Sequence, residues 1–217
     1  GGDFGYCDHG IDTAITIYVN PTPRFTVEVT DTIVCDSSTV EFDLTDLLGD
    51  VEGVKVYQLS TTQSGGISGI TADGEYGLGQ DFDDQLINST PEVQTVTYNF
   101  SARIRDDRTG GGDFGYCDHG IDTAITIYVN PTPRFTVEVP DTIVCDSSTV
   151  DFDLTDLLGD VEGVKVYELS TTQSGGISGI QAGGEYPLDQ DFQNQLFNST
   201  AQVQTVTYNF SARIRDD

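Results

Sequence analysis

An internal repeat with a period of 110 residues runs through the whole chain. Residues 1–9 return unchanged as residues 111–119, and residues 1–107 differ from residues 111–217 at only 12 positions. Solenoid and propeller repeats are about 20–50 residues long, whereas an immunoglobulin-type β-sandwich needs about 100 residues. Each copy is therefore long enough to enclose its own hydrophobic core, and the chain is predicted to be a string of domain-sized modules.

Alternation of apolar and polar side chains marks the strands of each module. Six stretches alternate or are rich in β-branched and aromatic residues, and turn residues bound them. No stretch has a sustained apolar period of 3.6 residues, so no helix longer than one turn is expected. The predicted strands are residues 25–29, 40–44, 54–59, 82–88, 93–104 and 124–129. The sequence therefore predicts an all-β fold.

A formal net charge of −27 limits the partners of the chain, which has 36 Asp and Glu against 9 Lys and Arg. Nucleic acids and anionic membranes are bound through basic patches, so neither is an expected partner. No run of about 20 apolar residues is present, so direct membrane insertion is not expected either. Charge of this sign favours cations and keeps an elongated polymer soluble.

Catalysis has little support in the sequence. The two histidines, His9 and His119, occupy equivalent positions in one loop, and His119 lies two residues from Cys117. A Cys/His pair needs a base within hydrogen-bond reach, and side chains so close along an extended segment do not meet in that way. The sequence has no P-loop and no zinc signature. We therefore expect no enzymatic activity.

Paired prolines within residues 20–23 and 130–133 separate the modules. Proline removes a ladder donor and favours extended geometry, so these Asn-Pro-Thr-Pro strings predict short, stiff hinges. In this frame residues 1–20 are the last strand of a preceding module, residues 21–130 are a complete module, and residues 131–217 are a module lacking its last strand. The first segment supplies the strand that the third lacks, so strand donation between chains would propagate a filament.

Four strings in the repeat resemble the PKD-like and Ig-like tandem repeats of giant Bacteroidetes cell-surface proteins. They are DTIVCDSSTV (31–40), LINST (86–90), QTVTYNF (94–100) and DTAITIYVNPTP (122–133). Repeats of this kind occur in SprB-type gliding adhesins, which the type IX secretion system exports. The chain departs from the commoner pattern because its third strand has no Trp and its last loop, residues 108–120, is long.

The resemblance implies tandem Ig-like/PKD-like β-sandwich modules, arranged as beads on a string at a bacterial cell surface. It also implies the shaft or spacer of a large secreted adhesin or extracellular filament that mediates attachment, gliding or cell–cell contact. The expected partners are neighbouring repeats, identical chains in a fibre, and other cell surfaces or glycans. In the alternative interpretation each module binds a ligand such as a glycan through its last loop, where Phe114 and Tyr116 are the aromatic candidates.

Each copy has two cysteines, which predicts structural disulfides in an oxidising compartment. Within one complete Ig-like module the first candidate pair is Cys35 and Cys117. Their loops normally lie at opposite ends of a sandwich, about 30 Å apart, whereas a disulfide needs Cα atoms within about 7 Å. Either the long last loop folds back along the sandwich, or each first-turn cysteine bonds the last-loop cysteine of the next module. The second arrangement leaves Cys7 and Cys145 facing modules outside this chain.

Carboxylates gather in two loops that share one end of an Ig-like module. A Ca²⁺ ion takes about 6–8 oxygen ligands, so clustered carboxylates at a module junction would hold one and stiffen the array. The alternative is that these side chains are solvated charges on polar turns, since no EF-hand spacing is present. The candidate ligands are Asp46, Asp50, Glu52, Asp106, Asp107 and Asp113.

Overall fold

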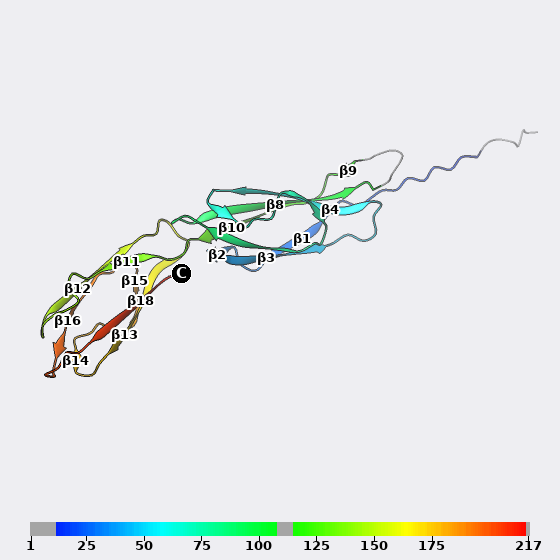
Figure 1. Ribbon diagram of the computed structural model, residues 1–217. Helices are drawn as coiled ribbons and strands as arrows, with labels where there is room; N and C mark the ends of the chain where they lie inside the picture. The colour runs from blue at the N-terminus through cyan, green and yellow to red at the C-terminus, as the bar shows by residue number, and fades with distance from the viewer. Residues whose placement is uncertain (1–11, 108–114, 216–217) are drawn as a thin grey trace, which may run out of the picture.

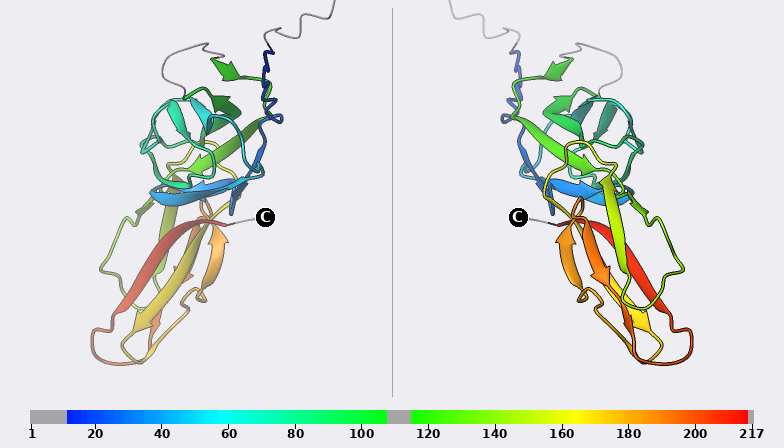
Figure 2. Two further views of the ribbon diagram at one scale, coloured as in Figure 1. Left: turned by 90° about the vertical axis from the view of Figure 1, so that its right-hand side faces the viewer. Right: turned by 90° about the vertical axis from the view of Figure 1, so that its left-hand side faces the viewer.

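The computed structural model describes residues 12–107 and 115–215. Within these ranges every element of regular secondary structure is a β-strand, which confirms the all-β prediction. Two elongated modules lie end to end, and residues 12–20 extend away from the far end of the first module without forming a strand (Figures 1 and 2). Among the described residues there is no helix that is long and apolar enough to cross a membrane.

The first module is a sandwich of two sheets. One sheet has the strand order β1-β3-β7-β5, and the other has the order β2-β10-β8-β4-β6, with β9 paired to β8. The strands are β1 (Phe25–Val29), β2 (Ile33–Cys35), β3 (Ser38–Asp46), β4 (Val54–Gln63), β5 (Ile67–Ser68), β6 (Gly74–Gly77), β7 (Phe82–Asn88), β8 (Gln94–Arg105), β9 (Tyr116–Cys117) and β10 (Asp122–Asn130). This order matches the immunoglobulin arrangement. Strands β1, β3 and β7 share one sheet, as the first, second and fifth strands of that fold do. Strands β4, β8 and β10 share the other sheet, as its third, sixth and last strands do.

Aromatic side chains fill the core between these sheets. The ring of Phe42 on β3 lies 4.6 Å from Phe82 and 4.5 Å from Tyr98, measured between centroids. Tyr57 on β4 is almost fully buried and packs 6.2 Å from Phe25, so a tyrosine occupies the third strand, where many such folds have a tryptophan. The alternation that predicted the strands therefore directs these rings inward.

The last strand, β10, holds the second sheet together. It pairs antiparallel with β8, from Asp122 opposite Ser101 to Val129 opposite Gln94, and it pairs in parallel with the short strand β2. Ile127 and Val129 on β10 are fully buried in the core. Each such side chain contributes about 1.5–3 kcal/mol of burial free energy, so β10 is an essential part of the module.

The second module repeats this arrangement without counterparts to β2, β9 and β10 among the described residues. Its sheets have the orders β11-β12-β16, β15-β13-β18 and β14-β17. The strands are β11 (Phe135–Glu138), β12 (Thr149–Asp156), β13 (Val164–Gln173), β14 (Ile177–Ser178), β15 (Gly184–Pro187), β16 (Phe192–Gln195), β17 (Phe197–Asn198) and β18 (Val206–Arg215). As a result its core is smaller, and among the described residues β18 pairs with β13 alone.

Candidate functional site: the joint between modules

The joint between the modules is closed by one side chain. Asn130 ends β10 and is buried; its Nδ2 donates a hydrogen bond to the carbonyl oxygen of Glu162 at 2.7 Å. The amide N–H of Glu162 in turn donates to Oδ1 of Asn130 at 2.8 Å. One carboxamide thus satisfies both backbone groups of a residue in the next module, which fixes the direction as well as the distance of the contact.

Backbone hydrogen bonds reinforce this joint at a second point. The N–H of Val93, just before β8, donates to the carbonyl of Asp160 at 2.7 Å. The N–H of Gly159 donates to the carbonyl of Pro91 at 2.8 Å. These two contacts lie between the turn before β8 and the loop before β13, so the modules are bonded at two separated points and rotation about the proline hinge is restricted.

The same side-chain contact occurs one repeat earlier. Asn20 Nδ2 donates to the carbonyl of Glu52 at 2.8 Å, and the N–H of Glu52 donates to Asn20 Oδ1 at 2.8 Å. Asn20 precedes Asn130 by one period of 110 residues, as Glu52 precedes Glu162. Two copies of the sequence therefore encode two copies of the joint, and we call each Asn–Glu pair the asparagine clamp.

The loop that presents Glu162 is held in place by its own residues. Gly163 has φ +119°, and a Cβ on it would lie 2.5 Å from the carbonyl oxygen of Arg215. Only glycine fits such a position. Lys165 forms an ion pair with Asp156 and donates to the carbonyl of Gly159 at 3.3 Å. The backbone of Glu162 is therefore preorganised for the clamp.

A cavity of about 780 Å³ opens beside the first clamp. Residues 16–23 and Glu52 line one side of it, and residues 116–119 line the other. Tyr116, a predicted ligand contact, is 42% exposed here, and the guanidinium of Arg103 lies 5.6 Å from its ring centroid. Phe114, the other aromatic candidate, lies outside the described residues. His119 also lines this cavity, together with Cys117 and Asp118, and the absence of enzymatic activity stays a prediction.

The structure does not bring the first candidate cysteine pair together. Cys35 is opposite Asn130 in the register of β2 and β10, at the end of the module that faces the next one. Cys117 is opposite Ile104, beyond the other end of β10. A nine-residue strand such as β10 spans about 30 Å, so no disulfide joins these two positions, and both are free thiols.

Cys117 and Cys35 instead each lie near a joint. Cys117 lines the cavity beside Asn20, and Cys35 lies beside Asn130. Cys145, the counterpart of Cys35, is an exposed free thiol in the second module. Cys7 lies outside the described residues. This placement favours the alternative in which a first-turn cysteine pairs with the last-loop cysteine of the following module.

The predicted calcium ligands are not gathered into a site among the described residues, where no group of three or more acidic, histidine or cysteine side chains is placed to hold a metal ion. Asp46 forms an ion pair with Lys55 at 2.6 Å and accepts a hydrogen bond from the N–H of Leu48. Glu52 takes part in the clamp through its backbone. The other candidates are Asp50, Asp106 and Asp107, and Asp113, which lies outside the described residues. Calcium binding stays a prediction.

The clamp was not predicted from the sequence. Asn20 and Asn130 were interpreted only as parts of the hinge strings, although an Asn that precedes Pro in both copies is the one signal that pointed to them. Their partners are backbone groups 32 residues away, and sequence patterns do not reveal which backbone a side chain will meet.

No family model and no curated protein matches the chain. Among solved structures, one chain of a chaperone–tip adhesin complex of CFA/I fimbriae aligns at 9% identity and a TM-score of 0.31, covering 88% of this chain and 98% of that chain. Domains FN1–FN3 of chicken CNTN1 align at 12% identity and a TM-score of 0.31, covering 91% and 68%. The D0–D1 domain of intimin aligns at 12% identity and a TM-score of 0.24, covering 89% and 91%. Similarity this low supports no conclusion about function, and the Ig-like character of the chain rests on its strand order.

Proposed function

We propose that this chain is a shaft segment of a large secreted cell-surface adhesin or extracellular filament. In this role the modules set the length and stiffness of an array that mediates attachment, gliding or cell–cell contact. Its partners are the neighbouring repeats, identical chains in a fibre, and the cell surface or glycan that the complete protein contacts. We propose a bacterial cell surface and export by type IX secretion on the sequence resemblance alone.

The asparagine clamp is the observation that carries this proposal. A module that acted alone would have no need of a buried side chain dedicated to the backbone of its neighbour. The clamp occurs at both joints of the chain, one period apart, at 2.7–2.8 Å. A repeated and directional joint supports a stiff array rather than a flexible tether.

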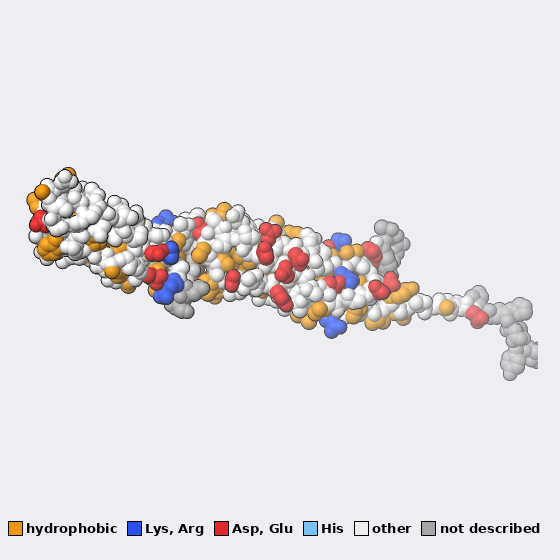
Figure 3. All heavy atoms as spheres, turned by 90° about the horizontal axis from the view of Figure 1, so that it is seen from below, with side chains coloured by type: hydrophobic (Ala, Val, Ile, Leu, Met, Phe, Trp, Pro, Cys, Tyr) orange, Lys and Arg blue, Asp and Glu red, His pale blue; other side chains and the backbone are white. Residues whose placement is uncertain are grey.

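The distribution of charge supports the same function. On the face drawn in Figure 3, acidic side chains lie over the first module, near the joint and at the tip of the second module, and Lys and Arg gather in few places. A net charge of −27 repels neighbouring parts of an array and other copies at long range, which favours an extended and soluble polymer.

Glycan binding is the second candidate function, and the half-exposed Tyr116 is the observation that favours it. Its ring borders the cavity beside the first clamp, where a sugar ring would stack. The same side chain faces residues 16–23, so packing against the preceding segment accounts equally well for its position. A Tyr116→Ala variant separates the two functions, because lost binding on a glycan array with an unchanged melting temperature would favour the ligand site.

Backbone amide relaxation tests the shaft function directly. In the wild-type chain at monomeric concentration, both modules are expected to tumble with one correlation time and one axis. Asn130→Ala removes both clamp bonds, so the modules are expected to tumble with separate, shorter correlation times. Asn20→Ala is the matched control, because it removes the same contact from the segment before the first module and leaves the Asn130 clamp intact. Wild-type modules that already tumble independently, or an Asn130→Ala chain as stiff as the wild type, would contradict a shaft held by the clamp.

A further inference from the structure

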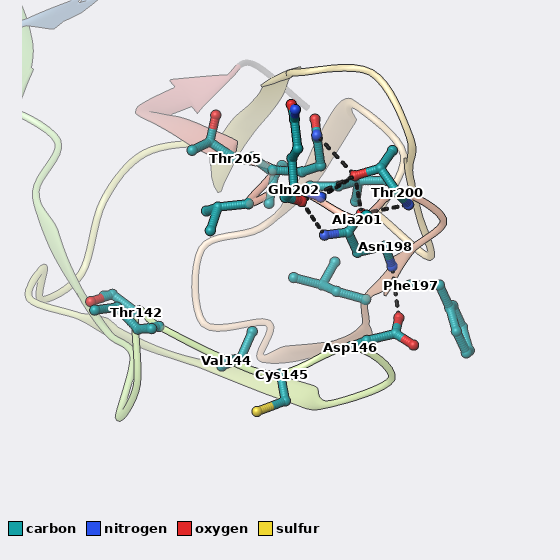
Figure 4. Close-up of a pocket in the computed structure, with 16 residues that line it drawn as sticks. Thr142, Val144, Cys145, Asp146, Phe197, Asn198, Thr200, Ala201, Gln202 and Thr205 are labelled. Carbon is teal, nitrogen blue, oxygen red and sulfur yellow. Dashed lines mark hydrogen bonds between the residues drawn. The ribbon is translucent and has the colours of Figure 1, made fainter.

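The turn before β8 has the same frame in both modules. In the first module Asn88 Oδ1 accepts hydrogen bonds from the N–H of Thr90 at 2.9 Å and from its hydroxyl at 2.8 Å, and Asn88 Nδ2 donates to the carbonyl of Glu92 at 2.8 Å. Side chains common to both copies hold this turn in one conformation. Figure 4 shows the counterparts that make the same three bonds at 2.8–2.9 Å in the second module, which are Asn198, Thr200 and Gln202.

The two residues at the tip of this turn differ between the copies. Residues 91 and 92 are Pro and Glu, whereas residues 201 and 202 are Ala and Gln. They are two adjacent positions among the 12 at which the copies differ. The three residues before them and the fifteen residues after them are the same in both copies. The sequence therefore varies at the tip and not in the side chains that hold it.

This tip is where the first module contacts the second. The carbonyl of Pro91 accepts a hydrogen bond from the N–H of Gly159 at 2.8 Å, and the side chain of Glu92 lies against the same glycine. A Cβ on Gly159 would lie 2.3 Å from Cγ of Glu92, whereas one on the corresponding Gly49 would have nothing within 4 Å. The φ of Gly159 is outside the left-handed region, so the neighbouring module, and not the backbone, requires glycine here.

Proline at position 91 favours the closed joint. Its ring fixes the φ of residue 91 and disfavours the α region for Thr90, so the carbonyl that Gly159 bonds is held in one direction. Alanine at this position would allow more conformations whenever the joint opens, and that freedom would be lost each time the joint closes. An exchange of this kind changes an equilibrium constant by about two- to fivefold.

Glutamate at position 92 opposes closure. Its carboxylate oxygen Oε1 would lie 3.2 Å from a Cβ on Gly159, in a loop that we call the receiving loop, residues 156–165. This loop carries three acids and one base, and the base, Lys165, already forms an ion pair with Asp156. Like charges this close repel, and dissolved salt screens the repulsion between exposed groups. The joint is therefore expected to tighten as the ionic strength rises, and glutamine at position 92 would reduce this dependence.

We propose that residues 91 and 92 set the strength of the joint, in addition to the asparagine clamp and without changing the fold of either module. The proline strengthens the joint, and the glutamate makes it depend on ionic strength. An array of copies with different tips then has joints of unequal strength, although the copies share one clamp and one receiving loop. This proposal rests on the shaft function, since it concerns how stiff that shaft is at each joint.

Hydrogen exchange of the amides that cross the joint tests this proposal in the 217-residue chain. The N–H groups of Gly159 and Val93 are bonded across the joint, so their exchange, relative to that of the β13 amides, reports how often the joint opens. Pro91→Ala is expected to speed their exchange by about two- to fivefold. Glu92→Gln is expected to slow it at low ionic strength and to make it less sensitive to added NaCl. Asp83→Gln is the matched control, because it removes one carboxylate from an exposed site on β7, outside the joint.

The glycine of the receiving loop tests the contact itself. Gly159→Ala is expected to speed exchange of the Val93 amide by about fivefold or more, because its Cβ displaces the side chain of Glu92. Adding Glu92→Ala, which removes Cγ, is expected to restore much of the wild-type rate. Gly49→Ala makes the same change in the identical loop of the first module and is expected to leave this amide as it is in the wild type. Equal exchange in the two glycine variants would overturn the proposal.

Two further results would contradict a joint tuned by its tip. A Pro91→Ala chain that exchanges like the wild type would overturn the proposal, and so would Glu92→Gln and Asp83→Gln chains with the same response to salt. In either case, protected wild-type amides at the joint would leave the shaft function standing. Wild-type joint amides without protection would overturn both proposals, because there would be no closed joint.

Discussion

The carboxamide of Asn130 bonds both backbone groups of Glu162, accepting from its N–H at 2.8 Å and donating to its carbonyl at 2.7 Å. The contact lies between modules, yet it has the geometry of a buried pair within one domain. A buried amide with both partners in place contributes more by avoiding unsatisfied groups than by the net strength of either bond. The joint is therefore specific, since few other relative positions of the modules would satisfy the same groups.

The first prediction concerns the glycine that orients this contact. Gly163→Ala is expected to destabilise the second module by about 1–3 kcal/mol, because alanine rarely adopts φ +119° and its Cβ would meet the Arg215 carbonyl. It is also expected to loosen the joint, since Glu162 would shift. Urea unfolding and amide relaxation measure the two effects. The control is Gly175→Ala, which has open space around its Cβ; equal behaviour of the two variants would contradict the prediction.

The second prediction uses a natural difference between the copies. Asp84 is buried in the first module and accepts hydrogen bonds from Tyr98 Oη at 2.5 Å and from Thr71 Oγ1 at 2.6 Å. Its counterpart in the second module is Asn194, whose Nδ2 has no partner among the described residues, like the hydroxyl of Tyr208 beside it. The amide of asparagine supplies donors where the site needs acceptors.

Asp84→Asn is therefore expected to destabilise the first module by about 1–3 kcal/mol, the cost of leaving a buried polar group unsatisfied. Hydrogen exchange of the β8 amides reports the stability of that module separately from the second. Asp83→Gln is the matched control, because it is the neighbouring natural difference at an exposed site and should change stability by less than about 0.5 kcal/mol. A loss of stability no larger for Asp84→Asn than for Asp83→Gln would show that the acceptor network contributes little.

The third prediction is a loss of stability at high pH. Burial raises the pKa of Tyr57 and Tyr98 in the first module and of Tyr208 in the second, and it raises the pKa of Tyr167 to about 12. In the unfolded chain a tyrosine loses its proton near pH 10. A raised pKa in the folded state means that the stability contribution is complete below about pH 10 and falls as the pH rises toward the folded pKa.

Urea midpoints measured below about pH 9 and above about pH 11 are expected to show this fall. The Tyr167→Phe variant should lose part of the pH dependence of the second module, because the phenylalanine ring packs similarly but does not titrate. A second module whose pH dependence is the same with and without this hydroxyl would contradict the assignment to Tyr167.

Local patterns predicted most strands of the first module, and non-local contacts account for what they missed. The bounds predicted for β1 and β7, residues 25–29 and 82–88, are those observed, because alternation and turn residues lie within the segments themselves. β2 was missed because it has only three residues and forms through pairing with β10, far along the chain. The second module has a smaller core among the described residues because they include no counterpart of β10, whose Ile127 and Val129 complete the first core.

The last prediction concerns where the cysteines lie relative to the joints. Cys35 lies opposite Asn130, and Cys117 lines the cavity that Asn20 also lines. Asn20 and Asn130 are equivalent positions one period apart. The first-turn cysteine of one module and the last-loop cysteine of the next are therefore expected to meet at one joint.

Oxidised glutathione is expected to link these two thiols in a chain extended by one further 110-residue repeat, in which Cys35 faces the cysteine one period after Cys117. The two thiols lose two protons and two electrons, and glutathione disulfide is reduced. Peptide mapping under non-reducing conditions should find this link, Cys35→Ser should abolish it, and Cys145→Ser should leave it in place. A link that Cys35→Ser and Cys145→Ser reduce alike would contradict this pairing.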